Sequence, residues 1–409
     1  MTWFCLPCCG VILPPSSFAN AGQLMNRRDF LNTLGAAAVT AFAPRPAFAR
    51  RSPAGYANLL VLVELKGGND GLNTVVPYAD PGYPELRPRL AVPRDQVLQL
   101  DQQAGFHPAL EPLMASWKSR ELAVVQGVGY PGANLSHFRS IDIWDSASNS
   151  NEYLTDGWLA RAFAAAPAPA TFAADAVVVG GAEMGPLRGG VRAIALANPE
   201  QFLRQARFAA PAGQARNAAL HHILRVEENI AQAAARLSGN RAFATEFPAH
   251  PFGNAVRTAA QVVAGEAGVA AVKVALGGFD THSGQPGRHA QLLKALAEGL
   301  AALKGALVEL GRWDSTLILT YSEFGRRPRE NLSNGTDHGT ASAHFVLGGR
   351  VKGGLYGLPP ALSRLDGNGN LPFAVDFRDL YATVLERWWG ADSTRALKGR
   401  FAPLDVIRA

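Results

Sequence analysis

The stretch 272–283, VKVALGGFDTHS, joins a mostly apolar run to a cluster of polar residues. The run 272–276 is short and, apart from Lys273, apolar, which is typical of a buried strand. From about 288 to 310 leucines recur at helical spacing, and Gly311 follows as a helix C-cap. This order of strand, polar loop and helix is the unit that determines the fold.

The same order recurs along the chain. Further apolar runs predict buried strands at 59–63, 122–125, 176–179 and 316–320, and another apolar run covers 345–347. A second helix is predicted over 376–389, with Asp376 as its N-cap and Gly390 after its end. Because strands alternate with long helices, we expect an α/β fold with a mainly parallel central sheet sandwiched by helices.

Three segments differ from this pattern. Residues from about 199 to 268 are rich in Ala and Gln and show no convincing strand, so they predict a helical insertion in the α/β domain. The segments 162–174, rich in Ala and Pro, and 362–371, rich in Gly and Asn, predict loops.

The N-terminal residues show the order of an export signal. Arg27 and Arg28 precede a short apolar stretch, 34–42, and Ala-Phe-Ala at 47–49 is a small-x-small cleavage signal. This order predicts a twin-arginine signal peptide that begins at Met25. We therefore expect residues 1–49 to be dispensable, residues 50–409 to form a single α/β domain, and the twin-arginine translocase to deliver it to the periplasm or the medium.

Composition excludes several classes of protein. All three cysteines lie within residues 1–49, so the exported part has no disulfide and no thiolate metal site. The net charge is only +6 and the basic residues are scattered, which argues against nucleic acid as a partner. No apolar run of about 18 residues follows the signal, so we expect no membrane span after cleavage. We expect His289 to face solvent, and the core to contain Trp144, Trp158, Trp388 and Trp389.

Polar residues follow three of the expected strands, in the segments 67–74, 277–283 and 321–326, and a fourth cluster precedes the run 345–347. Open parallel sheets bind ligands at the carboxyl ends of their strands. Asp280 and His282 are two residues apart and would face the same way on an extended segment. Oxygen and imidazole donors without thiolates suit Zn²⁺ or Mn²⁺. The alternative is that these residues only form turns, as Asn and Asp beside Gly commonly do.

Five motifs carry a resemblance: GGNDGLN at 67–73, SHFR at 136–139, GWLAR at 157–161, GFDTH at 278–282 and SEFGR at 322–326. Together with the leader they resemble a bacterial exported family catalogued as domain of unknown function 1501, over nearly all of 50–409. More distantly, the layout is similar to the alkaline phosphatase superfamily, which includes sulfatases and metal-dependent phosphoglycerate mutases. Members of that superfamily have a mixed sheet between helices, with two metal ions at the strand ends.

The superfamily resemblance implies a set of metal ligands. Asp280 and His282 would stand for its Asp-x-x-x-His pair, at a closer spacing. Glu323 would be a ligand at the next strand end, Asp70 would supply the first carboxylate, and His338 or His344 the later imidazole. Phe324 stands where the superfamily has a histidine ligand, which puts a second metal ion in doubt.

The resemblance also implies a nucleophile at a helix start after an early strand. Ser136 fits that position, His137 adjoins it, and Arg326 and Arg139 would clamp an anion. The alternative is that Ser136 caps the helix 138–145 and that the arginines are ion-pair partners.

These observations predict an exported metal-dependent hydrolase of phosphate or sulfate esters, acting on an anionic small molecule or a glycan ester. The alternative is a non-catalytic exported binding or assembly protein that retains the fold, which the phenylalanine at position 324 favours. Metal content, and the effect of substituting Asp280 or His282, distinguish the two hypotheses.

Overall fold

The computed structural model describes residues 55–196, 241–265 and 268–408. Their centre is a nine-stranded sheet with the order β11-β5-β10-β9-β1-β8-β6-β7, in which β12 also pairs with β5. The strands are β1 (Leu59–Lys66), β5 (Leu122–Gly129), β6 (Ala176–Val179), β7 (Ala193–Leu196), β8 (Ala271–Gly277), β9 (Thr316–Tyr321), β10 (Ser342–Leu347), β11 (Gly354–Gly357) and β12 (Val375–Asp376).

Most neighbours in this sheet are parallel. β1 pairs in parallel with β8 on one side and β9 on the other, and β6 and β7 continue the parallel arrangement. β10 is antiparallel to both of its neighbours, β9 and β5. β9 is buried throughout and β1 is buried except at Lys66, as expected for strands covered on both faces.

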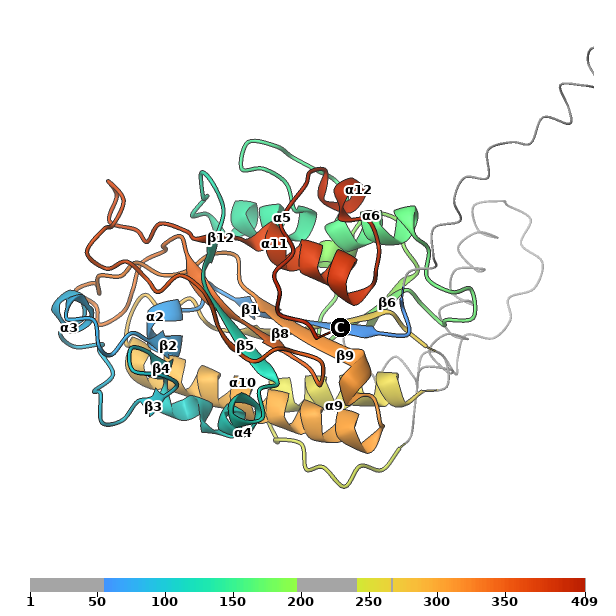
Figure 1. The fold of residues 1–409 in the computed structure, drawn as a ribbon, viewed down its shortest axis with the longest axis horizontal. Coiled ribbons are helices and arrows are strands. Elements are labelled where there is room, and N and C mark those ends of the chain that lie inside the picture. The colour runs from blue at the N-terminus through green and yellow to red at the C-terminus, as the bar shows by residue number, and fades with distance from the viewer. Residues whose placement is uncertain (1–54, 197–240, 266–267, 409) are drawn as a thin grey trace, which may run out of the picture. The chain divides into compact units, whose positions relative to one another are not determined.

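Helices cover both faces of the sheet (Figure 1). One face is covered by α5 (His137–Ser146), α6 (Trp158–Ala165), α11 (Phe377–Ala382) and α12 (Ser393–Leu397), and the other by α4 (Met114–Lys118), α9 (Pro251–Ala264) and α10 (Gln285–Glu309). Because side chains alternate along a strand, Val61 joins the apolar cluster under α10 and Leu62 joins the one under α5 and α11. The expected α/β fold, with a mainly parallel sheet sandwiched by helices, is confirmed.

The two predicted helices are present. α10 buries leucines at helical spacing, and Gly311, with φ of +65°, follows its end. α11 begins after Asp376, whose side chain accepts the N–H of Arg378, and it continues as a π-helical turn over Thr383–Trp388.

A smaller, three-stranded antiparallel sheet lies beside this core. It has the order β2-β4-β3, with β2 (Val75–Val76), β3 (Leu98–Gln99) and β4 (Gly105–Phe106). The short helices α2 (Gly71–Thr74) and α3 (Gly82–Leu86) follow β1, and there are 3-10 turns at η1 (Pro108–Leu113), η2 (Gly185–Leu187) and η3 (Trp313–Ser315). Across the residues described, none of the helices combines the length and the apolar character needed to cross a membrane.

Some of the predictions for single residues and segments agree with the structure and others do not. The four tryptophans are buried as expected, but the segment 162–174 begins inside helix α6, where Phe163 packs in the core. His289 was expected to face solvent and is only 1% exposed, because its ring lies under the loop after β1 and contacts Asn69. The leader 1–49 lies outside the described residues. So does most of the insertion 199–268, although its described part contains α9, which packs on α10 and β8.

Candidate metal site

The candidate site lies where several strand ends meet at one edge of the sheet. β1, β8 and β9 are parallel neighbours, so their carboxyl ends share that edge. β10 runs in the opposite direction and therefore begins there, just after His338. The loops after β8 and β9 supply Asp280 and Glu323, and the start of α5 supplies His137.

Two glycines after β1 allow the loops to approach one another. A Cβ added at Gly67, where φ is +113°, would lie 2.4 Å from the backbone nitrogen of Asp280. At Gly68, with φ of +77°, it would lie 2.4 Å from the ring of Phe324. A side chain at either position would push the polar loops apart. Glycine is therefore needed here for two reasons: it lets the loops approach closely, and it allows a positive φ.

Asp280 lies among three imidazoles. We call this group, formed by His137, Asp280, His282 and His338, the histidine–aspartate cluster. Asp280 Oδ1 is 3.0 Å from Nε2 of His282 and 3.2 Å from Nε2 of His338. Asp280 Oδ2 is 3.5 Å from Nε2 of His137, and the Nε2 atoms of His282 and His338 are 2.9 Å apart. The carboxylate therefore faces one and the same nitrogen, Nε2, on all three rings.

The other ring nitrogen of each histidine contacts an acceptor. His338 Nδ1 lies 2.8 Å from the carbonyl oxygen of Leu135, which can only accept, so Nδ1 carries the proton. Burial, the largest influence, lowers the pKa of His338 and favours its neutral ring. His282 Nδ1 lies 3.2 Å from Asp337 Oδ1, and His137 Nδ1 lies 2.8 Å from Glu323 Oε1. An imidazole whose Nδ1 carries the proton leaves the lone pair of Nε2 free to bind a cation, and the three Nε2 atoms meet at the Asp280 carboxylate.

This arrangement fits a divalent cation. The donor atoms of His137, Asp280 and His338 all lie within 4.8 Å of one another. A tetrahedral Zn²⁺ with bonds of about 2.1 Å holds its ligands roughly 3.4 Å apart, close to the separations within the cluster. A cation between them would be bound by the Nε2 lone pairs and the carboxylate together. The contacts at Nδ1 are those that usually orient histidine ligands from behind.

Glu323 supports the cluster from outside it. Its Oε1 accepts the backbone N–H of Gly67 at 2.8 Å in addition to its contact with His137. The structure therefore places this predicted ligand behind a histidine, while His137, which was predicted next to a nucleophile, presents its own nitrogen to Asp280.

Arg326 holds the loops of the site together. Its side chain is fully buried, and it donates to the carbonyl oxygens of Gly68 (2.7 Å), Thr336 (2.8 Å) and Phe279 (3.0 Å). It also donates to Asp280 Oδ1 at 2.6 Å. Burial by itself raises the pKa of Asp280, but Arg326, with help from His338 and His282, lowers that pKa to about 2. All three guanidinium nitrogens of Arg326 are therefore used within the protein, and none is left to clamp a substrate anion. Arg139 is likewise bonded to Asp142 and to backbone carbonyl oxygens.

Phe324 and Ser136 flank the cluster. The buried ring of Phe324 packs 4.9 Å from the ring of His137 and 4.5 Å from that of His338. Ser136 is exposed at the N-cap position of α5, but its side chain does not cap the helix and makes no hydrogen bond to a described residue. In the chain Ser136 lies between Leu135, whose carbonyl oxygen contacts His338, and His137, which belongs to the cluster, and its hydroxyl is unengaged.

Two predicted ligands lie elsewhere. The carboxylate of Asp70 accepts four donors: the N–H groups of Leu72 and Asn73, Arg87 at 2.6 Å and Gln285 at 2.5 Å. It is a helix cap and a buried ion-pair partner, with no lone pair directed at the cluster. His344 is the third residue of β10 and pairs with Val125, so it lies inside the sheet rather than at its edge. Burial lowers its pKa to about 3, and neither of its ring nitrogens has a partner among the described residues.

A cavity of about 570 Å³ adjoins the site through Leu135. We call it the polar cavity, because its lining includes Tyr130, Arg327, Thr340, Asp366, Asn368 and Asn370. The half-buried Arg327 has no ion-pair partner among the described residues, and its Nε is buried without a hydrogen bond. Nothing in the run SEFGRR distinguishes the second arginine from the first, so Arg327 was not among the predicted site residues.

Comparison with known proteins identifies a family without an assigned activity. The family model described as "Protein of unknown function (DUF1501)" matches residues 91–401. No curated protein matches the chain. Among solved structures, "Ps i-CgsB" is 14% identical with a TM-score of 0.38, covering 84% of this chain and 74% of that one.

Two further structures are enzymes by their titles. The phosphonate monoester hydrolase SpPMH from Silicibacter pomeroyi is 13% identical with a TM-score of 0.36, covering 84% of this chain and 75% of that one. The PsFucS1 sulfatase from Pseudoalteromonas sp. is 11% identical with a TM-score of 0.36, covering 85% and 70%.

Proposed function

Because the chain belongs to the DUF1501 family of proteins of unknown function, and that membership assigns no activity, we propose from the geometry of its site that it is an exported metal-dependent hydrolase of phosphate or sulfate esters. The observation that supports this proposal best is the convergence of three imidazole Nε2 atoms on the Asp280 carboxylate, with each Nδ1 held by an acceptor. These four side chains converge on one point, as the ligands of a divalent cation do.

The proposed ligands are the four residues of the histidine–aspartate cluster. A bound Zn²⁺ or Mn²⁺ would supply Lewis acidity toward an ester oxygen. Asp337, Leu135 and Glu323 would keep the imidazoles oriented, and Arg326 would keep Asp280 ionised and its loop in place. Phe324 fills the space beside His137 and His338, so we expect about one ion per chain.

The remaining residues would handle the substrate. The hydroxyl of Ser136, unengaged beside the cluster, is the proposed nucleophile. The polar cavity would hold the rest of the ester, with the guanidinium of Arg327 toward its anionic group and Asp366, Asn368 and Asn370 toward hydroxyl groups. These partners suit a sugar or another polyol, so we include a glycan ester among the substrates.

Metal analysis of the purified protein tests the site. We expect about one Zn²⁺ or Mn²⁺ per chain in the wild-type protein and a loss of at least tenfold in metal affinity in His282→Ala and His338→Ala. Asp337→Ala should weaken metal binding by roughly 10- to 100-fold, because an oriented imidazole loses its outer partner, and Asp337→Asn should lose less because its amide oxygen can still accept.

The matched control is His250→Asn. His250 caps α9 through its Nδ1, lies outside the cluster, and can be replaced by asparagine, which is a good N-cap. Its metal content should equal that of the wild type. If the wild-type protein binds no divalent ion even after reconstitution, the cluster is a hydrogen-bonded network and the hydrolase proposal is wrong.

Hydrolysis of p-nitrophenyl phosphate and p-nitrophenyl sulfate by the metal-loaded protein tests the reaction. Ser136→Ala should lose at least 100-fold in kcat while binding the metal normally, because the nucleophile is not a ligand. Arg327→Gln should raise KM with a smaller effect on kcat. Equal rates for wild type and Ser136→Ala would exclude Ser136 as the nucleophile.

A non-catalytic binding or assembly role is the second candidate. Two observations favour it. Phe324 puts a packed ring where a histidine ligand was expected, and all the guanidinium nitrogens of Arg326 are hydrogen-bonded within the protein. A protein of this kind would bind the metal but leave both esters intact, and Ser136→Ala would leave its cellular function unchanged.

A further inference from the structure

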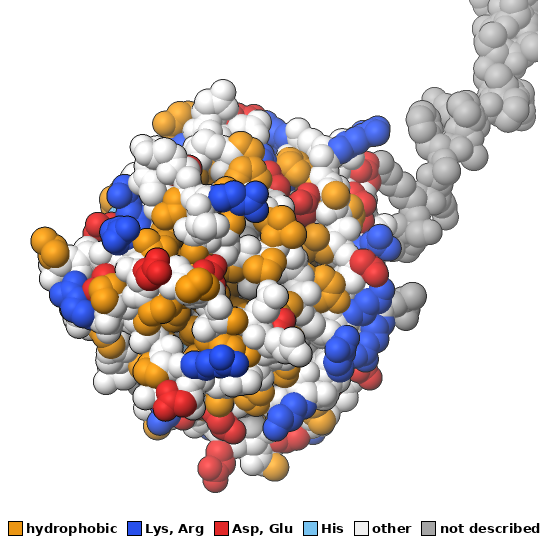
Figure 2. Space-filling model, turned by 60° about the vertical axis from the view of Figure 1, so that its left-hand side comes forward, with side chains coloured by type: hydrophobic (Ala, Val, Ile, Leu, Met, Phe, Trp, Pro, Cys, Tyr) orange, Lys and Arg blue, Asp and Glu red, His pale blue; other side chains and the backbone are white. Residues whose placement is uncertain are grey.

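A second cavity, of about 350 Å³, lies apart from the histidine–aspartate cluster, between α2, the start of β10 and the segment 358–374. We call it the apolar pocket, since most of its lining is apolar: Leu72, Val75, Leu358, Pro360, Leu371 and Phe373 are examples. The face in Figure 2 shows hydrophobic side chains gathered near its centre, with charged ones scattered between them. A cavity of this size and character is typical of a small-molecule site.

The walls of this pocket are stiff. Pro359, Pro360 and Pro372 line it, and each fixes its own backbone φ. Leu358 is 67% exposed and Phe373 is 40% exposed, so the apolar surface is open at the rim. A ligand would cover this surface at little cost in ordering the walls.

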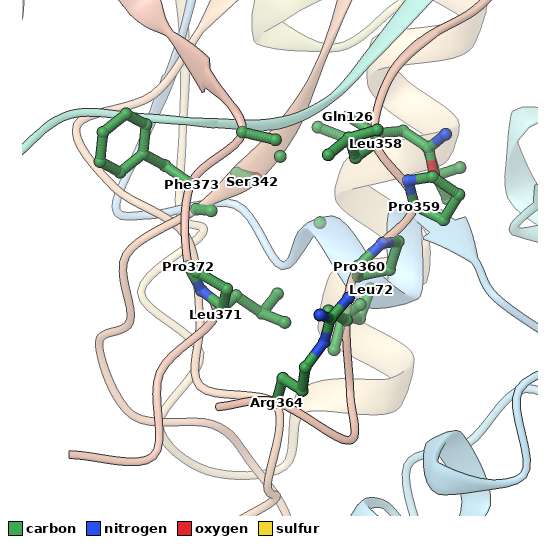
Figure 3. Close-up of a pocket in the computed structure, with 17 residues that line it drawn as sticks. Leu72, Gln126, Ser342, Leu358, Pro359, Pro360, Arg364, Leu371, Pro372 and Phe373 are labelled. Carbon is green, nitrogen blue, oxygen red and sulfur yellow. The ribbon is translucent and has the colours of Figure 1, made fainter. Parts of the chain in front are cut away.

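Two polar groups in the pocket lack partners. Gln126 is only 5% exposed, yet its amide makes no hydrogen bond to any residue that the structure describes. Arg364 is exposed and its guanidinium forms no ion pair within the described part of the chain. Figure 3 shows the two at opposite ends of the pocket, with Arg364 reaching toward Pro360 and Leu72 and the amide of Gln126 beside Pro359.

From these contacts we propose that the apolar pocket binds a small anionic amphiphile, namely a medium-chain carboxylate or a compact ring of similar size that carries one. The guanidinium of Arg364 would pair with the carboxylate through two parallel hydrogen bonds. The apolar body would lie against the proline and leucine walls. The buried Gln126 amide would take a neutral polar group at the far end of the ligand. No residue of the histidine–aspartate cluster lines the apolar pocket, so this binding requires no metal, although Leu371, Pro372 and Phe373 line both this pocket and the polar cavity.

Titration calorimetry with butanoate, hexanoate and octanoate tests the proposal on the wild-type protein. Because burial of apolar surface drives the association, each added methylene should tighten Kd about fourfold. Arg364→Gln should weaken octanoate at least tenfold and leave 1-octanol unchanged. Arg257→Gln is the matched control. It removes an exposed arginine on α9, outside the pocket, and should bind octanoate as the wild type does.

Two further variants locate the site. Ala361→Trp places a large ring in the pocket and should abolish binding of both octanoate and 1-octanol. The wild type should bind 8-hydroxyoctanoate more tightly than octanoate, and Gln126→Leu should lose this difference while it binds octanoate normally. Unchanged metal content and an unchanged Tm verify that each variant is folded.

Three results would overturn the proposal. The first is no binding of octanoate at millimolar concentration, and the second is octanoate binding that Ala361→Trp leaves unaltered. The third is preferential binding of a sugar phosphate in place of octanoate, which would assign the pocket to a polar ligand. None of these results bears on the metal site, which the metal analysis tests separately.

Discussion

Asp145, near the C-terminus of α5, is a buried carboxyl group without a full set of partners. It is 7% exposed, and its Oδ1 has no hydrogen bond to a described residue. Burial is the largest influence on it and raises its pKa to about 8, with Glu64 and Asp142 adding to the shift and Lys273 and Arg188 opposing it. Its neighbours Glu64 and Lys273 form a buried pair at 2.7 Å. In the folded protein Asp145 is therefore protonated near neutral pH.

This residue should make stability depend on pH. Between pH of about 4 and 8 the folded state holds a proton on Asp145 that the unfolded state has lost, so the free energy of unfolding falls as pH rises, by at most about 1.4 kcal/mol per pH unit. Asp145→Asn mimics the protonated carboxyl and should flatten this decline. Urea unfolding of both proteins from pH 5 to 8 measures it, and parallel curves for the two proteins would contradict the assignment.

At the scale of elements, a buried ion pair connects the start of α2 to the chain that follows the site. Arg87, just after α3, donates to Asp70 and Asn73, both at 2.6 Å, and to the carbonyl oxygens of Arg327 and Pro328. Both charged side chains are fully buried. The pair thus fixes the loop after β1 against the segment that contains Arg326 and Arg327.

Arg87→Leu should destabilise the fold by about 3–5 kcal/mol, because it leaves the Asp70 carboxylate buried without its counter-charge. Asp70→Asn in the same chain removes that charge and keeps a side chain able to cap α2, so the double variant should recover part of the loss. Denaturant unfolding measures both proteins. A double variant as unstable as Arg87→Leu alone would show that lost packing, not the unpaired charge, sets the cost.

At the scale of the whole molecule, we propose that the signal within residues 25–49 directs the folded, metal-loaded chain through the twin-arginine translocase. Replacing Arg27 and Arg28 by lysine keeps the charge but removes the arginine pair, so export should fail and the protein should accumulate in the cytoplasm. Cell fractionation with an antibody against the chain measures this. Arg50→Lys, a lysine substitution further along the chain, is the control and should be exported normally. Normal export of the Arg27→Lys/Arg28→Lys protein would exclude the twin-arginine route.

Much of the architecture follows from local sequence alone. The apolar runs that became β1, β5, β6, β8 and β9, and the leucine spacing of α10, determine an α/β sheet because periodicity and burial act over a few neighbouring residues. The strands β7 and β11 were not predicted, since each has only four residues and is incompletely buried, so its hydrophobic signal is weak. The polar clusters after β8 and β9, with Asp280, His282 and Glu323, were likewise visible as strand-end residues.

Only the tertiary structure decided which polar residues form the site. It depends on β10 being antiparallel, which brings His338 to the shared edge and leaves His344 inside the sheet. It also depends on partners distant in sequence. Arg87 forms an ion pair with Asp70 and so keeps that carboxylate away from the cluster, and Glu323 contacts Nδ1 of His137. Sequence spacing determines which side of a strand a residue faces, whereas its hydrogen-bond partner depends on how separate loops meet in space.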